Sequence, residues 1–436
     1  MKGGFVVDGP LLVLGRVLLL LLLLPVAVWF VLDVSPVLTY SGSIITARHL
    51  PQAQACSNYA KGKWVADARR PLYSGNECRR WLSRMWSCRR TERTDFSYES
   101  YRWQPHDCEM PDFSGPNFLQ RYVLQSSAPF SNRFCREDSS IVSCNISMAM
   151  PIVSCNISMA MPDDRMRNRT LAFVGDSLGR EQFQSMMCIA TGGKRSPEVE
   201  DVGRRYGLEK APSPFSPGGS AYRFPETNTT ILFYWSATLS QLEPLTDERR
   251  SYALHLDRPA PFLKEHLPSF DALVLNTGHH WNKVKFRRNR WRLYDGGKPV
   301  GEANLSRARG AKLHSIARWA DAQLARHPRV SVFLRTISPV HFVGGEWDTG
   351  GRCDSTVPLS GGSGVSRDRS SDLAAERAVN GTRVRLLDVT AISQLRGEGH
   401  ISNHSTKVQR EVYDCLHWCL PGIPDTWNEL LFALMQ

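Results

Sequence analysis

The feature that most constrains this chain is an apolar run that leads directly into a glycine-bounded turn. The segment Leu171–Val174 is wholly apolar, and Gly175-Asp176-Ser177-Leu178 follows it at once. A buried strand that turns sharply into a helix leaves the first helical side chain exposed at the carboxyl edge of a sheet. The pattern therefore predicts an accessible Ser177 hydroxyl at such an edge.

A second motif, near the end of the chain, complements the first. Asp414-Cys415-Leu416-His417 supplies a carboxylate and an imidazole three residues apart, a spacing at which the acid can orient the ring that deprotonates a serine. Either motif alone favours a plainer interpretation, a helix N-cap or a pair of surface groups. Together they predict acyl transfer, with Ser177 as nucleophile, His417 as base and Asp414 as the orienting acid.

The amino terminus is dominated by an apolar segment. Residues 11–32 are almost wholly apolar and are long enough to span a bilayer if Arg16 reaches the headgroups. Basic residues precede the leucine run 18–24, which predicts a cytosolic tail of residues 1–10 and a luminal remainder. A cleaved signal peptide is the alternative, because the purely apolar core is short and small residues follow it.

Cysteine and sequon usage indicate an oxidising, glycosylating compartment. All eleven cysteines lie outside the apolar segment. Sequons occur at Asn145, Asn156, Asn168, Asn228, Asn304, Asn380 and Asn403. The net charge of +12 would attract anionic polymers such as uronic-acid-bearing glycans, although a diffuse arginine excess is also common on ordinary solvated surfaces. We expect no nucleic-acid partner.

Composition divides the rest of the chain into four parts. A short stem, 33–55, precedes residues 56–121, whose Cys, Trp and Arg content with little periodicity predicts a disulfide-stapled lobe packed onto a larger domain. From 167 to 436, apolar strands alternate with helical stretches, which indicates an α/β fold with a parallel sheet. The expected strands are Leu171–Val174, Ile231–Trp235, Ala272–Leu275, Val330–Leu334 and Val384–Val389, and the clearest amphipathic helix is Ser306–His327.

Residues 122–166 form an atypical insert. The sequence IVSCNISMAMP occurs twice in tandem, at 141–151 and 152–162, and is too short for a solenoid unit. It indicates a recent duplication or a gene-model artefact inside an exposed, poorly ordered loop. The insert holds three of the eleven cysteines, and the eight that remain can pair completely.

Several long motifs together carry a family resemblance. They are Trp64-Val65, Pro71-Leu72-Tyr73, Tyr101-Arg102-Trp103-Gln104-Pro105, FVGDSLGREQ and DCLHWCLPGIPDTWNELL. Over about residues 56–436 the chain resembles the plant trichome birefringence-like family. The resemblance implies a Golgi type II membrane protein with a Cys-rich lobe on a PC-esterase domain, an SGNH/GDSL-like three-layer αβα sandwich that O-acetylates cell-wall polysaccharides. The insert departs from the family pattern, in which Pro111–Arg121 runs almost straight into the strand before Ser177.

The resemblance also assigns residues. Asn276 matches the SGNH asparagine, a second oxyanion donor beside the Ser177 backbone amide, although an Asn-Thr-Gly turn also occurs without catalytic purpose. The family's glycine donor has no clear counterpart here. From its position alone, about one helical turn after Ser177, Arg180 is expected to hold the substrate or an acidic group, with an ordinary helix salt bridge as the alternative. The implied disulfides are Cys56–Cys108, Cys78–Cys188, Cys88–Cys419 and Cys353–Cys415.

The expected partners follow from the same resemblance. They are a polysaccharide acceptor, xylan or another hemicellulose first, an acetyl donor as co-substrate, the Golgi membrane and other wall-acetylation membrane proteins, with no bound cofactor or metal. The alternatives are a polysaccharide acetylesterase and a non-catalytic glycan-binding protein.

Three other features of the sequence have competing interpretations. Gly175-x-Ser177-x-Gly179 also fits the α/β-hydrolase elbow, but there a long segment separates acid from histidine. Cys415-x-His417-x-Cys419 has an unusual spacing for zinc, and an oxidising lumen favours disulfides. Trp235 or Trp281 could stack on a sugar face, and Trp235 is equally a core candidate.

Overall fold

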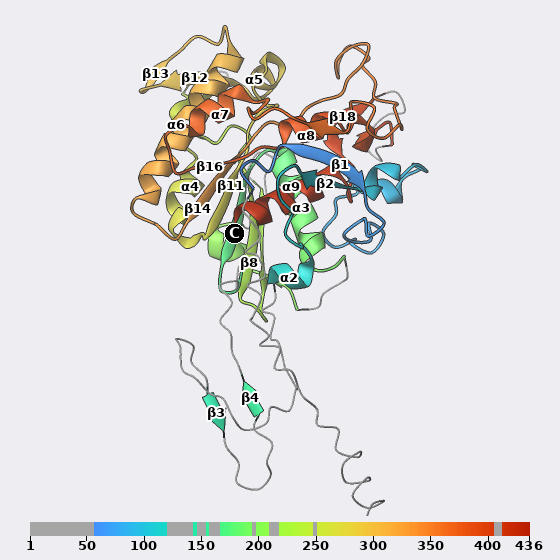
Figure 1. The fold of residues 1–436 in the computed structure, drawn as a ribbon. Helices are drawn as coiled ribbons and strands as arrows, with labels where there is room; N and C mark the ends of the chain where they lie inside the picture. The colour runs from blue at the N-terminus through green and yellow to red at the C-terminus, as the bar shows by residue number, and fades with distance from the viewer. Residues whose placement is uncertain are drawn as a thin grey trace, which may run out of the picture. The chain divides into compact units, whose positions relative to one another are not determined.

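A seven-stranded sheet forms the centre of the fold (Figure 1). The computed structural model describes residues 56–119, 143–145, 154–156, 166–193, 198–208, 218–246, 251–404 and 412–436. Within it the strand order is β16-β14-β11-β5-β8-β7-β6, with β16 through β8 parallel and β7 and β6 antiparallel at one edge. The strands are β5 Thr170–Gly175, β6 Glu200–Asp201, β7 Gly219–Phe224, β8 Thr229–Trp235, β11 Ala272–Leu275, β14 Ser331–Arg335 and β16 Arg385–Leu387. The five expected strands are the five parallel ones.

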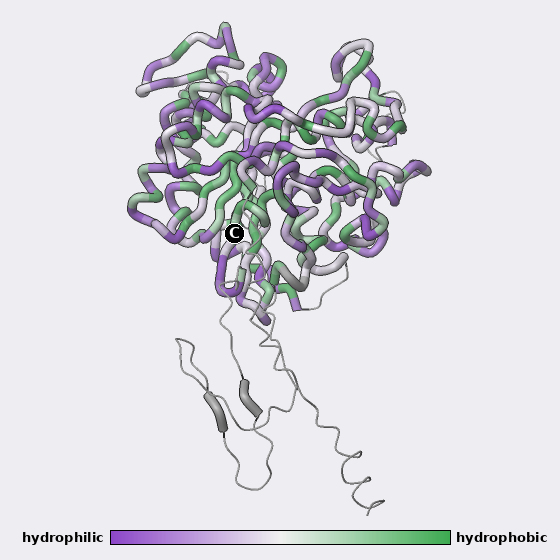
Figure 2. The backbone as a smooth tube through the Cα atoms, in the orientation of Figure 1, coloured by the Kyte–Doolittle hydropathy of each residue, from purple (hydrophilic) through white to green (hydrophobic). Residues whose placement is uncertain are grey.

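Helices cover both faces of this sheet. Because successive side chains of a strand point to opposite faces, Leu171 and Phe173 of β5 pack into one core, and Ala172 and Val174 into the other. The first core includes α3 Ser177–Ala190 and α9 Ile423–Leu434, and the second includes α4 Pro261–His266, α6 Leu305–Leu324 and α7 Leu373–Val379. Apolar residues accordingly run along the central strands in Figure 2, as expected for strands buried on both faces. The described part of the chain therefore has three layers.

A second, smaller sheet was not expected from the sequence. It has the order β13-β12-β10-β9, formed by β9 Ser240–Pro244, β10 Tyr252–Pro259, β12 Trp291–Asp295 and β13 Lys298–Pro299, with α5 Lys283–Asn289 beside it. Its own apolar core contains Trp281, Phe286 and Leu293. Trp281 is buried there and donates from Nε1 to Thr277 Oγ1 over 2.8 Å, so the suggestion that it stacks on a sugar is wrong.

The Cys- and Trp-rich lobe has more regular structure than its sequence indicated. Strands β1 Gly62–Ala66 and β2 Tyr101–Pro105 form an antiparallel sheet with β15 Gly364–Val365, which belongs to the sequence of the larger domain. Trp64, Trp86 and Trp103 belong to the same apolar core as α3 and α9. The lobe therefore folds onto the larger domain, as expected, and β15 lies about 300 residues from its partner β1, where local periodicity could not indicate it.

The remaining elements connect these parts. They are α2 Gly115–Leu119, α8 Thr390–Gln394, η1 Cys88–Arg90, η2 Ser97–Ser100, η3 Gly203–Tyr206, η4 Leu267–Ser269, η5 Gly397–Gly399, and the hairpin of β17 His400–Ser402 and β18 Asp414–Trp418. Within the insert, β3 Ser143–Asn145 and β4 Ser154–Asn156, one from each repeat copy, pair antiparallel. The prediction of an exposed loop otherwise falls on residues outside those described.

The expected membrane segment 11–32 and the stem also lie outside the described residues. Among the residues that are described, no helix has the length and hydropathy needed to cross a bilayer. The membrane anchor therefore stays a prediction from the sequence.

Four disulfides join distant parts of the described chain. The pairs are Cys56–Cys108, Cys78–Cys188, Cys88–Cys419 and Cys353–Cys415, the same as those the family resemblance implied. Cys88–Cys419 spans 331 residues and ties the lobe to the chain just after β18, whereas Cys56–Cys108 spans 52 residues within the lobe. Loop closure of this length restricts the unfolded chain strongly.

These two disulfides should differ in their contribution to stability. In the chain-entropy model, removing Cys88–Cys419 by a double alanine substitution should lower the free energy of unfolding by about 1 to 2 kcal/mol more than the matched removal of Cys56–Cys108. Chemical denaturation of the two variants under non-reducing conditions measures the difference. An equal or smaller loss for the Cys88–Cys419 variant would contradict the prediction.

Candidate active site

The turn after β5 is built around a buried asparagine. Asp176 caps α3 by accepting from the backbone N–H of Leu178 over 3.0 Å, and Asn276, at the end of β11, donates from Nδ2 to Asp176 Oδ1 over 2.6 Å. A Cβ atom on Gly175 or Gly179 would lie 1.9 or 2.2 Å from Asn276 Oδ1. Both glycines are therefore required by the close approach of Asn276, and the contact fixes the direction in which α3 begins.

Three side chains expected to act together are in contact at the start of α3. His417 Nε2 lies 2.7 Å from Ser177 Oγ. At the other side of the ring, His417 Nδ1 lies 2.9 Å from Asp414 Oδ2 and 3.1 Å from Oδ1. With Nδ1–H donating to the carboxylate, Nε2 is left as an acceptor directed at the Ser177 hydroxyl.

An irregularity in the β17–β18 hairpin lets Asp414 and His417 share one side. Residues three apart on a regular strand point to opposite faces. Here His400 pairs with Trp418, and Ser402 pairs with Asp414. A stretch of four residues along β18 therefore lies opposite a stretch of two residues along β17, so β18 is not a regular strand here. Asp414 Oδ1 also accepts the backbone N–H groups of Leu416 and His417, at 3.2 and 2.9 Å, which curls the segment around the carboxylate.

Asp414 and His417 shift each other's pKa in opposite directions, each favouring the charged form of the other. Burial acts to lower the pKa of His417, but the adjacent Asp414 carboxylate and its hydrogen bond outweigh burial and raise it. Burial likewise acts to raise the pKa of Asp414, and the charge and hydrogen bonds of His417 bring it below its usual range. Asp414 is therefore held as a carboxylate, and the imidazolium that forms when His417 accepts a proton is stabilised.

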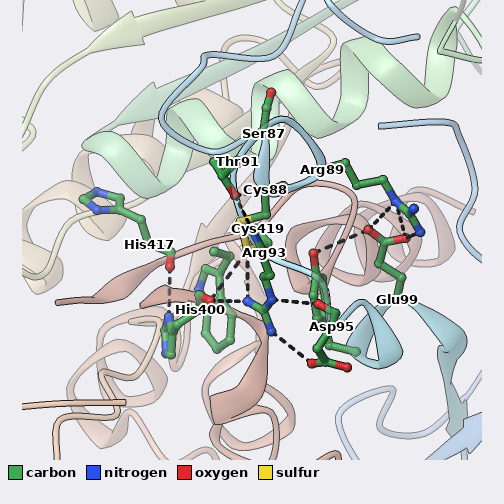
Figure 3. Close-up of a disulfide and its surroundings, with 12 residues drawn as sticks. Ser87, Cys88, Arg89, Thr91, Arg93, Asp95, Glu99, His400, His417 and Cys419 are labelled. Carbon is green, nitrogen blue, oxygen red and sulfur yellow. Dashed lines mark hydrogen bonds and ion pairs between the residues drawn. A yellow bond between two sulfur atoms is a disulfide. The ribbon is translucent and has the colours of Figure 1, made fainter. Parts of the chain in front are cut away.

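Residues of the lobe hold the hairpin that carries His417, with Cys88 and Arg93 close to Cys419 and His400 (Figure 3). Trp86 stacks near the His417 ring with centroids 6.0 Å apart, and the Cys88–Cys419 disulfide anchors the chain two residues further on. The buried Arg93 guanidinium donates to the carbonyls of Glu398 and His400, at 2.6 and 2.7 Å, so it holds the β17 end of the hairpin. A segment of the lobe thus positions a ring that the distant domain supplies.

Glu181 is a residue that the sequence interpretation missed. It lies one helical turn beyond Ser177, fully buried, and its Oε1 accepts the backbone N–H of Trp418 over 2.9 Å. Burial raises the pKa of Glu181 well above the usual carboxyl range, against the opposing effects of the His417 charge and the Trp418 hydrogen bond. The one sequence signal for Glu181 is its position four residues after Ser177, on the same face of the helix. Through this bond α3 and β18 hold Ser177 and His417 in register.

Asn276 and Arg180 differ in how they relate to Ser177. Asn276 packs against the turn itself, with one amide N–H used by Asp176. Arg180 is half-buried, its guanidinium 5.2 and 5.0 Å from the rings of Phe233 and Trp235, and within the described residues it has no ion pair with a carboxylate. The alternative of an ordinary helix salt bridge is therefore not seen in the described part of the chain.

His279, Cys415 and Cys419, which lie around the site, each have a structural partner. His279 donates from Nε2 to the Ser338 carbonyl over 2.7 Å, and burial lowers its pKa to about 4, so it is neutral. Cys415 and Cys419 are both in disulfides, which removes their thiolates as zinc ligands.

Comparison with known proteins places this chain in a family. Residues 164–434 match the PC-Esterase family, described as a GDSL/SGNH-like acyl-esterase family found in Pmr5 and Cas1p, and residues 54–109 match the PMR5 N-terminal domain. The first match covers the α/β domain, and the second covers the Cys-rich lobe.

Individual relatives agree with these matches. The chain is 50% identical over 393 residues to Protein trichome birefringence-like 14 of Arabidopsis thaliana, covering 86% of each chain. It is 45% identical to Protein trichome birefringence-like 15, covering 89% of this chain and 74% of the relative, and 28% identical to Xyloglucan O-acetyltransferase 1, covering 89% and 82%, both of the same plant. The chain therefore belongs to the trichome birefringence-like group of the PC-esterase family.

Proposed function

We propose that this chain is an O-acetyltransferase that moves acetyl groups through an acetyl-Ser177 intermediate to hydroxyl groups of a cell-wall polysaccharide. The observation that carries the proposal is the contact of His417 Nε2 with Ser177 Oγ at 2.7 Å, with Asp414 on the opposite ring nitrogen. An alcohol is a weak nucleophile until such a base removes its proton. Family membership and the acetyltransferase named among the relatives support the same chemistry.

The first half-reaction acetylates the enzyme. As Ser177 Oγ attacks the acetyl carbonyl carbon of the donor, His417 Nε2 takes the hydroxyl proton and Asp414 stabilises the imidazolium. The tetrahedral oxyanion then expels the donor's leaving group, which receives that proton from His417. In the second half-reaction His417 deprotonates an acceptor hydroxyl, whose oxygen attacks the acetyl carbon, and the released Ser177 oxygen regains the proton.

The developing oxyanion needs donors that are already in place. The Ser177 backbone N–H, in the first turn of α3, is one by position, and the second amide N–H of Asn276 is our candidate for the other. Arg180, a cation beside the same turn with no described acidic partner, is a candidate for holding the acetyl oxygen or the acceptor. None of these roles requires a bound cofactor, since the acetyl donor is a co-substrate.

Transfer and hydrolysis differ in the second nucleophile. The same three residues would serve an acetylesterase, in which water replaces the sugar hydroxyl, and the outcome depends on whether the acceptor is positioned better than water. The relative named as a xyloglucan acetyltransferase favours transfer. We expect xylan or another hemicellulose as the acceptor class, and a Golgi type II membrane location in which residues 33–436 are luminal.

The acyl-enzyme is directly observable. Incubating the purified chain with acetyl donor and no acceptor should add one acetyl group to the peptide that contains Ser177, because the intermediate forms before any sugar is needed. Intact-protein and peptide mass spectrometry measure it. Ser177→Ala should abolish the adduct, whereas Ser185→Ala, a buried serine two turns along the same helix, serves as the matched control and should retain it. An adduct that persists in Ser177→Ala would refute the proposal.

The pH profile tests the role of Asp414. His417 acts as a base only when neutral, and Asp414 raises its pKa above 6.5 despite burial, so kcat should rise with pH through a pKa above that value. In Asp414→Asn the carboxylate is lost, so the acid limb should shift to lower pH while the plateau falls about 100-fold or more. Asp321→Asn, which removes a half-buried carboxylate paired with Arg383, should change neither. A limb that stays in place in Asp414→Asn would contradict the assignment.

Glu181 should act as a positioning residue through its hydrogen bond to Trp418. Glu181→Gln keeps the acceptor and the volume, so kcat should stay within about threefold of the unmodified protein. Glu181→Ala leaves the Trp418 N–H unpaired and should lower kcat about 10- to 100-fold with little change in KM. Steady-state kinetics separate the two effects. Equal losses in both variants would contradict this positioning role, because Gln keeps the acceptor that the Trp418 N–H uses.

A further inference from the structure

A second pair of histidines lies next to β18 and takes no part in the proposed reaction. His341, in the loop after β14, has its Nδ1 atom 2.7 Å from Nε2 of His400, the first residue of β17. The other ring nitrogen of His400, Nδ1, lies 3.0 Å from the backbone carbonyl oxygen of His417 (Figure 3). A chain of two rings therefore leads from His341 to the backbone of the residue that contacts Ser177.

Both rings of the pair are held by packing. His400 is 1% exposed, and its ring stacks on the indole of Trp418 with the centroids 3.8 Å apart. The backbone N–H of His341 donates to the Cys415 carbonyl over 3.1 Å, and a Cβ atom on Gly397 would lie 3.1 Å from His341 Cδ2. The loop after β14 is thus bound to β18 through its backbone as well as through the two rings.

The surroundings of His400 keep its ring neutral. Burial lowers the pKa of His400 to about 3, and repulsion from His341 adds to this effect. The His417 carbonyl and the Asp414 carboxylate act in the opposite direction but do not outweigh burial. On the lobe side the Arg93 guanidinium donates to the His400 carbonyl over 2.7 Å, which places another positive charge nearby. His400 therefore has a single ring N–H.

That single N–H determines the direction of both hydrogen bonds of His400. The His417 carbonyl oxygen can only accept, so the proton is on His400 Nδ1. His400 Nε2 is then an acceptor, and the contact of 2.7 Å with His341 is a hydrogen bond only when His341 donates from Nδ1. Two unprotonated nitrogens at this distance would repel each other through their lone pairs.

The outer nitrogen of His341 is compatible with this direction. His341 Nε2 lies 3.0 Å from the backbone carbonyl oxygen of Gln394 and 3.4 Å from the side-chain Nε2 of the same residue. Burial lowers the pKa of His341, against the opposing effects of the Gln394 carbonyl and the Glu398 carboxylate. A neutral ring accepts from the Gln394 amide, and a protonated ring donates to the carbonyl. In both forms Nδ1–H stays directed at His400.

We propose that His341 is a positioning residue that fixes the tautomer of His400 and thereby holds the backbone of His417. The inference rests on the proposed function, because it takes His417 to be the base that activates Ser177. Without the His341 donor, a buried ring nitrogen of His400 has no partner, which is unfavourable, and nothing assigns the single proton of that ring to Nδ1. The His417 carbonyl then loses its fixed donor.

Substitutions at His341 separate the donor from the shape of the ring. His341→Phe keeps a planar ring and removes the donor, whereas His341→Asn keeps an amide N–H near the position of Nδ1. With 4-nitrophenyl acetate as donor, we expect kcat to fall about tenfold in His341→Phe with little change in KM, and to stay within about threefold in His341→Asn. His314→Phe, at an exposed histidine of α6, is the matched control and should change neither constant. Equal losses in His341→Phe and His341→Asn, or an unchanged kcat in His341→Phe, would overturn the proposal.

The tautomer itself can be measured in the unmodified full-length chain. Nitrogen NMR of protein labelled with ¹⁵N-histidine distinguishes protonated from unprotonated ring nitrogens, and the His400 signals are those that His400→Gln lacks. At neutral pH we expect the proton on Nδ1 and none on Nε2. A proton on Nε2, alone or in addition to one on Nδ1, would overturn the proposal, because His341 could not then donate to that nitrogen.

The NMR measurement is separable from the test of the proposed function. It needs neither an acetyl donor nor a glycan, so a chain that forms no acetyl-Ser177 adduct but has His400 protonated at Nδ1 would refute acetyl transfer and leave the tautomer assignment standing. A normal adduct with His400 protonated at Nε2 would refute the role of His341 alone.

Discussion

The site depends on one hydrogen bond between residues that are 240 positions apart, His417 Nε2 to Ser177 Oγ. Local forces do not hold such a contact, because the serine begins a helix of the central domain and the histidine lies on a short hairpin strand. Its geometry must be fixed by what surrounds the two elements. Glu181 joins α3 to Trp418, Asn276 fixes the turn before Ser177, and the lobe holds the hairpin through Arg93 and the Cys88–Cys419 disulfide.

This arrangement gives the Cys-rich lobe a role beyond covering the sheet. Trp86 packs against the ring of His417, and the lobe shares the core that contains α3 and α9. The Cys88–Cys419 disulfide just after β18 and the Arg93 hydrogen bonds to the neighbouring start of β17 limit the movement of His417 relative to Ser177. Preorganisation of this kind contributes to catalysis because the reacting groups do not have to be ordered during the reaction. The lobe and the domain therefore form one functional unit.

Much of the central fold could be predicted because its signals are local. The five parallel strands are buried on both faces and read as continuous apolar runs, and α6 has a regular amphipathic period. The pairing of Gly175-Asp176-Ser177 with Asp414-x-x-His417 indicated the site for the same reason. By contrast, β15 pairs with β1 across the length of the chain, and the hairpin irregularity that turns Asp414 toward His417 depends on backbone register. The spacing of Glu181 from Ser177 places it on the same helix face, but its partner is the backbone N–H of Trp418, which no side-chain pattern reveals.

The central claim, that Ser177 carries the acyl group, is tested most directly by pre-steady-state kinetics with 4-nitrophenyl acetate as a chromogenic donor. The account predicts a burst of nitrophenolate equal to about one per chain, followed by slower turnover that polysaccharide accelerates, and no burst in Ser177→Ala. A burst of the same size in Ser177→Ala, or a steady-state turnover in Ser177→Ala equal to that of the unmodified chain, would contradict it.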